Sequence, residues 1–320
     1  MVADQAGVSR QTVSNVLNAP HLVRAETRRR VRGAIRLLGY RPNQAARTLR
    51  IGRSRLLAAR IDASRHGDDH FDSHTFLRGL TEAAARSRFH LILYDAVDAE
   101  AEIRAYEDLQ VSYQPAGFVL LNIGARDRRT TWLADHNMPF VVFGGLVQDQ
   151  YDQVSIDDTF GTAEMTRRLL TAGHRRIGFI DWPRDVQPDS PRRAGWMKSM
   201  ADAGADLAGL ERRVSNDRDH GERAAADLLG TAHPPTALVC GSDLLALGAM
   251  WASSSTAPST AVTGYGDTPV AAAVGLTSVD RRVGHAAASC IDMVTEPADG
   301  DRPGARRVLL QPRIVARRSG

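Results

Sequence analysis

The chain has 320 residues, of which 43% are hydrophobic and 24% charged, the composition of an ordinary globular protein. This excludes collagen-like, coiled-coil and disordered classes, and the length suggests about two or three domains. Cys240 and Cys290 are too few for a disulfide framework and lack C-x-x-C spacing, so we expect both to be buried. No leader peptide is recognisable and no apolar run approaches the roughly 18 residues of a membrane span, so we expect a cytoplasmic protein.

Charge is distributed unevenly along the chain. Residues 1–60 contain 13 arginines and only two acids, Asp4 and Glu26, a net charge of +11. The rest of the chain has 28 basic and 35 acidic residues, a net charge of −7. A basic head joined to an acidic body is typical of a protein that binds a phosphate backbone with one part and senses or catalyses with another.

The segment "VADQAGVSRQTVSNVLN" predicts two short helices. The first spans residues 2–6 and ends at Gly7, and Ser9 is suited to cap the second. We expect Val13, Val16 and Leu17 to form the buried face of the second helix. The side chains near its start suit groove reading, because Arg binds guanine, Gln and Asn bind adenine, and Thr binds phosphate or a thymine methyl group. They are Arg10, Gln11, Thr12 and Asn15; the alternative is a solvated polar face.

A third helix is predicted from Ala25 to Leu38, with Val31, Ile35 and Leu38 inward. Beyond it, Pro42 opens a helix from Asn43 to about Leu49 that is too short to be stable alone in water. We expect this segment to fold on docking, with Leu49 inserted between base pairs in a minor groove. Alternatively, Leu49 packs on the body as a linker residue.

From residue 56 the sequence alternates short apolar runs with helical stretches. The runs are "LLAARI", "FHLILYD", "GFVLLNI", "FVVFGG", "RIGFID", "ALVCG" and "AVTGYG". Residues 76–88, 159–172 and 244–252 have helical periodicity. This alternation predicts α/β architecture with parallel sheets, in two doubly wound subdomains at residues 56–154 and 155–274. The C-terminal segment, read as one final strand and a basic tail, is expected to cross back. A cleft between such subdomains is a natural small-molecule site.

The segment "RHGDDHFDSHTF" places His66, His70 and His74 four residues apart among aspartates. One helical face of this kind could bind zinc or nickel, but Gly67 and the acidic run favour a solvent-facing loop, so no metal is predicted. Phe71 and Phe76 could form a platform for a sugar ring or anchor the loop. We find no Walker loop, G-x-S-x-G elbow or H-E-x-x-H motif, so neither an enzyme nor a cofactor is predicted.

The blocks "AGVSRQTVSNVLN", "ETRRRV" and "LGYRPNQAARTL" resemble the DNA-binding head of LacI/GalR bacterial transcriptional regulators. The resemblance implies a helix-turn-helix domain at residues 1–41, a hinge helix and linker at 42–55, and an effector-binding and dimerisation core at 56–320. It implies that Arg10, Gln11 and Asn15 read bases. The implied phosphate or backbone contacts are Ser9, Thr12, Asn18 and Asn43, and the implied minor-groove pair is Ala46 and Leu49.

The body carries a second resemblance. "GHRRIGFI", "RRAGWMKSM", "PTALVCGSDLLALGAM" and "VTGYGD" resemble the ligand-sensing core that these regulators share with periplasmic sugar-binding proteins. Arg192 is the implied effector arginine, since its planar fork of donors suits hydroxyl or carboxylate groups; alternatively it pairs with Asp185 or Asp189. Ser242 and Asp243 either begin a helix or line the pocket. Asn216 and Asp267 are further candidates.

Two positions depart from the sugar-binding pattern. Ser242 stands where the family commonly has Asn or Asp, and Gly266 where it has the first acid of "G-[YF]-D-D". The effector is therefore left open. The implied function is a homodimeric repressor of carbohydrate-utilisation genes, released from a pseudo-palindromic DNA operator by a sugar-like effector. The alternatives are a corepressor-type regulator that responds to a nucleobase or other non-sugar metabolite, a carbohydrate-binding protein without a regulatory role, and a sugar-metabolising enzyme with a DNA-binding head.

Overall fold

The computed structural model describes residues 1–39, 54–61, 68–121, 123–124, 126–144, 150–183, 190–296 and 304–320. Of residues 18 and 68–72 it describes the backbone alone. The chain divides into two compact units, Met1–Ser54 and Arg55–Gly320.

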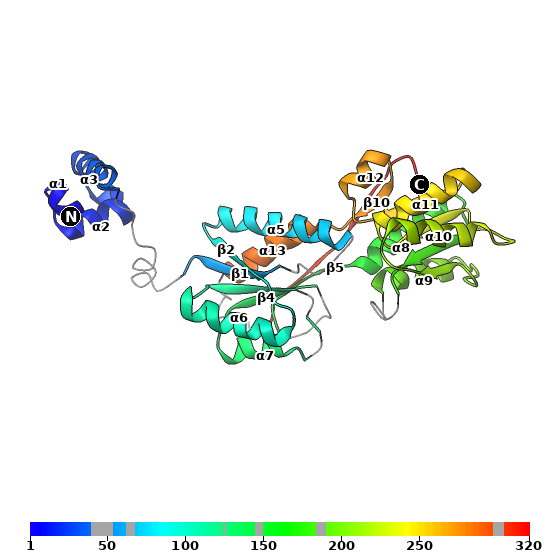
Figure 1. The fold of residues 1–320 in the computed structure, drawn as a ribbon, viewed down its shortest axis with the longest axis horizontal. Helices are drawn as coiled ribbons and strands as arrows, with labels where there is room; N and C mark the ends of the chain where they lie inside the picture. Colours follow the sequence, from blue (N-terminus) through cyan, green and yellow to red (C-terminus); the bar gives the residue numbers. More distant parts are fainter. Residues whose placement is uncertain are drawn as a thin grey trace. The chain divides into compact units, whose positions relative to one another are not determined.

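The first unit is a small helical head (dark blue in Figure 1). Its elements are α1 (Val2–Ala6), α2 (Arg10–Asn18), the 3-10 helix η1 (Pro20–Leu22) and α3 (Ala25–Leu37). Its core consists of small side chains, namely Val2, Ala6, Val13, Val16, Val31 and Ala34. The prediction of a buried Leu17 is wrong, since 36% of this residue is exposed. Valines and alanines from the three helices form the interior in its place.

The second unit contains two six-stranded sheets. The first has the order β11-β5-β4-β3-β1-β2, and all its neighbouring strands are parallel. Its strands are β1 (Leu56–Arg60), β2 (His90–Tyr94), β3 (Gly117–Leu121), β4 (Phe140–Phe143), β5 (Gln153–Ile156) and β11 (Arg307–Leu310). Helices α5 (Asp68–Arg86) and α13 (Val283–Thr295) cover one face, and α6 (Ala99–Ser112) and α7 (Arg128–Asp135) cover the other (Figure 1).

The second sheet has the order β12-β10-β9-β8-β6-β7, with only β12 antiparallel. Its strands are β6 (Ile177–Asp181), β7 (Glu211–Arg213), β8 (Ala237–Cys240), β9 (Ala261–Tyr265), β10 (Thr277–Asp280) and β12 (Arg313–Val315). Helices α8 (Asp158–Thr171) and α9 (Pro191–Asp202) pack on one face, and α10 (Arg218–Leu229) and α11 (Asp243–Thr256) on the other; α12 (Pro269–Val274) follows β9.

Strand periodicity explains this layering. Successive residues of a strand point to opposite faces, so Phe179 packs with α9 while Ile180 packs with α10 and α11. Strands covered on both faces are apolar at nearly every position, as the sequence runs show. Cys240 and Cys290 are both fully buried, which confirms their prediction, and burial raises the pKa of each thiol.

The described chain passes between the two sheets at three crossovers. The first joins β5 to α8 at residues 156–158, the second joins β10 to α13 at 280–283, and the third joins β11 to β12 at 310–313. The prediction of one final strand is wrong, because the third crossover at Gln311 and Pro312 splits it between the sheets. Since β5 and β10 both enter crossovers at their carboxyl ends, the carboxyl edges of both sheets lie beside the crossovers.

The aspartate- and histidine-rich segment differs from its prediction. Helix α5 begins at Asp68, so a loop over the whole segment is wrong. Phe76 is buried and stacks on Phe143, with ring centroids 4.4 Å apart, so it belongs to the core of the first sheet. His66 lies outside the described residues, among which no group of three or more His, Cys, Asp or Glu side chains could hold a metal ion. Within the same residues, no helix is long and apolar enough to cross a membrane.

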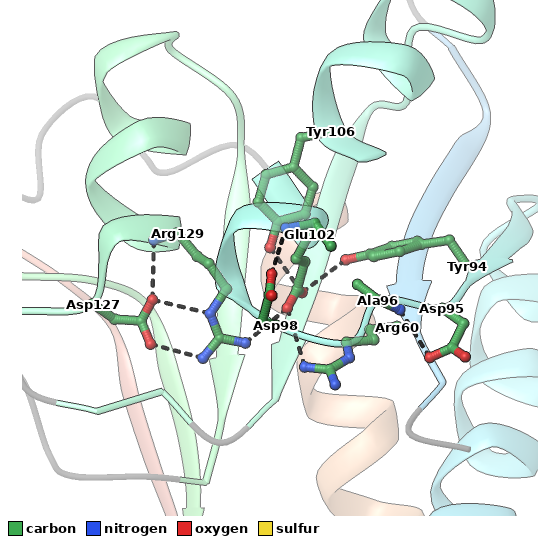
Figure 2. Close-up of polar contacts among 10 residues, drawn as sticks. Arg60, Tyr94, Asp95, Ala96, Asp98, Glu102, Tyr106, Asp127 and Arg129 are labelled. Carbon is green, nitrogen blue, oxygen red and sulfur yellow. Dashed lines mark hydrogen bonds and ion pairs between the residues drawn. The ribbon is translucent and has the colours of Figure 1, made fainter. Parts of the chain in front are cut away.

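A buried ionic network fixes the carboxyl ends of β1 and β2 to α6 and α7 (Figure 2). Glu102 of α6 is fully buried and accepts four hydrogen bonds, from Tyr94 (3.1 Å), Tyr106 (2.9 Å), Arg60 (3.2 Å) and Arg129 (2.8 Å). Arg129 also donates two bonds to Asp127, the N-cap of α7, at 2.9 and 2.7 Å. A buried carboxylate needs such partners, because an uncompensated charge is costly to bury.

Candidate DNA-binding and ligand sites

The start of α2 is held by its cap. The Ser9 hydroxyl accepts the Thr12 amide at 3.1 Å and lies 2.9 Å from the Thr12 hydroxyl oxygen. Gly7, at φ 59°, ends α1 in the left-handed conformation that glycine favours. These contacts confirm the predicted turn between two helices. Both predicted phosphate contacts on this turn, Ser9 and Thr12, thereby also have a capping role.

Three predicted base readers lie on the first turns of α2. Arg10 and Gln11 are exposed and Asn15 is half-buried. The Gln11 side-chain amide donates to Oδ1 of Asn15 at 3.0 Å, so these two amides, four residues apart, lie on the same side of the helix. Two side-chain amides on one side of α2 are a suitable arrangement for reading adjacent base edges in a major groove.

The other predicted DNA contacts are less fully described. Asn18 is the last residue of α2, and only its backbone is described. Asn43, Ala46 and Leu49 lie outside the described residues. The roles of these four residues therefore remain predictions from the family resemblance.

Arg30 is a residue that sequence reasoning counted only as charge. Its guanidinium donates to the carbonyl of Ala6 at 2.6 and 3.2 Å and to that of Gly7 at 3.0 Å. These bonds satisfy carbonyls that the end of α1 leaves without helical partners. Arg28 similarly donates to Pro20 at 2.7 Å. Arg28 and Arg30 thus stabilise the turns of the head through hydrogen bonds to backbone carbonyls.

In the second unit, Arg192 lies at the carboxyl edge of the second sheet. It follows the N-cap of α9 and is buried between two aromatic rings, with its guanidinium carbon 4.3 Å from the Trp182 ring centroid and 4.4 Å from that of Tyr265. One terminal nitrogen donates to the carbonyl of Gly241. Asp185 and Asp189, the alternative partners of Arg192, lie outside the described residues. These two cation–π contacts and the hydrogen bond to Gly241 hold the guanidinium in place.

Two other predicted residues contact each other at this edge. Ser242 follows β8 and caps α11 by accepting the Leu245 amide at 3.1 Å. Its hydroxyl donates to Oδ1 of Asn216, in the loop after β7, at 2.6 Å. The two residues are 26 positions apart in sequence. Their contact supports the expectation that both belong to one site.

The carboxylates of Asp243 and Asp267 have partners within the chain. Asp243 is buried, accepts the Thr268 amide at 2.7 Å and accepts the Ser278 hydroxyl. Burial raises the pKa of Asp243 above its ordinary value. Asp267 pairs with Arg317 at 2.7 Å. These contacts favour a structural role for both aspartates: Asp243 ties α11 to β10 and to the loop before α12, and Asp267 ties that loop to the C-terminal segment.

Asp181 and Trp182 are site residues that sequence reasoning missed. Asp181 ends β6 and Trp182 follows it, at the same edge as Arg192. Asp181 is fully buried; one oxygen accepts the Ser190 hydroxyl at 2.5 Å, and the other has no hydrogen-bond partner in the described part of the chain. Burial raises the pKa of Asp181. A tryptophan directly after a buried strand was the one available signal, since the carboxyl edge is where ligands bind in such sheets.

Comparison with known families agrees with this geometry. Residues 2–43 match the model for bacterial regulatory proteins of the lacI family. Residues 65–288 match that for periplasmic binding proteins and the sugar-binding domain of the LacI family. A helix-turn-helix head on a core of two parallel sheets defines a DNA-binding transcriptional regulator. The chain belongs to the LacI family.

Individual relatives cover most or all of the chain. The regulator AglR of Rhizobium meliloti is 34% identical over 254 residues, 78% of this chain and 70% of AglR. The regulator CelR of Thermobifida fusca is 30% identical over 335 residues, 100% of this chain and 97% of CelR. A solved complex of CelR with cellobiose is 26% identical, with a TM-score of 0.69, and covers 100% of this chain and 98% of that one. A lac repressor dimer bound to operator shares the fold, with 23% identity and a TM-score of 0.82, over 99% of this chain and 97% of that one.

Proposed function

We propose that this protein is a cytoplasmic homodimeric repressor of carbohydrate-utilisation genes, released from a pseudo-palindromic operator by a sugar. One chain carries both a pair of side-chain amides on one side of α2 and a buried arginine in contact with the Trp182 and Tyr265 rings, and this observation carries the proposal. The full-length similarity to CelR, solved with cellobiose, supports a sugar as effector.

The core binds its effector through Arg192 and the Ser242–Asn216 pair in this proposal. The guanidinium is held in plane, so it donates to ring hydroxyl groups in a fixed direction. Ser242 and Gly266 replace the larger polar residues that the resemblance leads us to expect, so the pocket is wider there. Relatives over almost the full length also include the repressor PurR of Klebsiella pneumoniae, at 27% identity. A ligand that tightens operator binding would mark the corepressor alternative.

The test is a thermal-shift screen of the full chain against mono- and disaccharides, sugar phosphates and nucleobases. A ligand at 100 times its dissociation constant adds about 2.7 kcal/mol to stability, which raises the melting temperature by a few degrees. Each hit is then tested for operator release. We expect a sugar hit that Arg192→Ala abolishes while ligand-free operator binding is retained. A nucleobase hit that tightens operator binding, with no response to any sugar, would overturn the sugar assignment.

A further inference from the structure

Two crossovers between the sheets are joined by an ion pair. Asp158 opens α8 directly after the first crossover, and Arg281 lies in the second. Their side chains form a two-point contact, Nε to Oδ1 at 3.1 Å and Nη2 to Oδ2 at 3.0 Å. Only 18% of the arginine side chain and 15% of the aspartate side chain are exposed. A two-point ion pair that is shielded from solvent is stronger than an ion pair on the surface.

Tyr265 extends this contact to the ligand site. Its hydroxyl donates to Oδ1 of Asp158 at 2.9 Å, while its ring lies against the Arg192 guanidinium. Burial raises the pKa of Tyr265, so the hydroxyl keeps its proton. Burial alone would raise the pKa of Asp158, but Arg281 and Arg192 outweigh it and the pKa is lowered. A protonated donor therefore faces a charged acceptor.

The same hydroxyl lies where all three crossovers meet. A Cβ atom on Gly161, in the first turn of α8, would lie 2.7 Å from the Tyr265 hydroxyl and 3.0 Å from the ring of Pro312 in the third crossover. Such distances are too short for a side chain, so glycine is required for this approach. Tyr265 thus bonds Asp158 of the first crossover, Asp158 pairs with Arg281 of the second, and the close approach at Gly161 places Pro312 of the third nearby.

We propose that Tyr265 and Asp158 are positioning residues that transmit effector binding at Arg192 to the crossovers. This inference rests on the proposed function, with Arg192 as effector ligand. A ligand that draws the guanidinium from its place shifts the tyrosine ring stacked on it, and the hydroxyl then pulls on the Asp158–Arg281 pair. Because the crossovers set the angle between the two sheets, this contact biases the open and closed forms of the core.

The first test separates ligand affinity from coupling. Tyr265→Phe keeps the ring on Arg192 and removes only the hydroxyl. With cellobiose, maltose, sucrose and trehalose as probes, we expect the ligand Kd to change less than about threefold. We expect the ligand-induced change in operator Kd to fall by about tenfold, as for one hydrogen bond to a charged group. Arg281→Lys, which keeps the charge but loses the fork, should give an intermediate loss. The control Lys198→Gln breaks the exposed Lys198–Asp202 pair on α9, outside the crossovers, and should change neither quantity.

The outcomes distinguish the two proposals. A wild-type protein whose operator binding responds to none of these sugars nor to any screened metabolite overturns the proposed function. A wild-type response that Tyr265→Phe leaves at full size overturns the positioning role alone. A second measurement needs no ligand: amide hydrogen exchange at residues 157–161 and 281–283 should accelerate in Tyr265→Phe and not in Lys198→Gln. Unchanged exchange there would also overturn the inference.

Discussion

The Ser242 hydroxyl donates to Oδ1 of Asn216 at 2.6 Å while accepting the Leu245 amide at 3.1 Å. One side chain thereby caps α11 and fixes the loop after β7. The sequence named both residues as candidates for the ligand site, and the structure brings them together. Ser242 therefore affects both stability and the shape of the site.

Replacing Ser242 with alanine should lower the free energy of unfolding by about 1 kcal/mol, because an N-cap contributes about 0.5–2 kcal/mol. Urea denaturation measures the difference. Ser254→Ala is the matched control, since Ser254 lies on the exposed side of the same helix and donates only to Trp251. An equal loss in both variants would show that the cap at Ser242 contributes nothing specific.

Glu102→Gln should destabilise the second unit by about 3–5 kcal/mol, because it leaves the Arg60 and Arg129 cations without their shared buried carboxylate. Chemical denaturation monitored by tryptophan fluorescence provides the measurement. Glu100→Gln, which breaks an exposed pair with Arg128, should cost less than about 1 kcal/mol. Comparable losses in the two variants would mean that burial of the network adds no stability.

Asp181→Asn should stabilise the protein at neutral pH. Burial raises the pKa of Asp181 in the folded state, so ionisation of this carboxyl group costs stability above its unfolded pKa of about 3.9. The gain from asparagine should shrink as the pH falls through the folded pKa and disappear below the unfolded one. Melting temperatures of both proteins across pH 4 to 8, at about one-unit steps, test this sign. A gain that grows toward acid pH would contradict it.

Asn15→Ala should weaken operator binding by about 1–3 kcal/mol and relax preference at one base position in each half-site. The expected cause is loss of a side-chain amide that pairs with a base edge. Fluorescence anisotropy on a set of single-base operator variants measures both effects. Gln5→Ala, an exposed change on α1, should leave the preference unchanged. An equal loss on all sequences would reassign Asn15 to backbone contact.

Most of the fold could be predicted from the sequence, because both faces of the central strands are buried and their apolar runs are continuous. All seven apolar runs contain strands of the structure. The strands that were not predicted are short and polar, such as β7 with "ERR" and β10 with "TSVD". Their pairing depends on neighbours distant in sequence, and no local pattern reports it. The proposed subdomain boundary at residue 154 falls within β5, a strand of this kind.

Site residues were predictable where a motif carries them. Arg192 and Ser242 lie in motifs of the family resemblance, and the structure adds their contacts. Trp182 and the Asp158–Arg281 pair could not be found in this way. The two charged partners are 123 positions apart, and only the crossovers bring them together. The structural role of Arg30 could not be predicted for another reason: it is one of many arginines in the head, and no periodic pattern distinguishes it from the others.

We propose that this chain binds a specific two-fold DNA sequence and leaves it when a sugar binds. The most direct measurement is selection of duplexes from a random library by the purified full-length protein, with and without the sugar found by thermal shift. We predict enrichment of one pseudo-palindromic sequence that the sugar abolishes. Recovery of unrelated sequences, with binding that depends on salt alone, would contradict the claim.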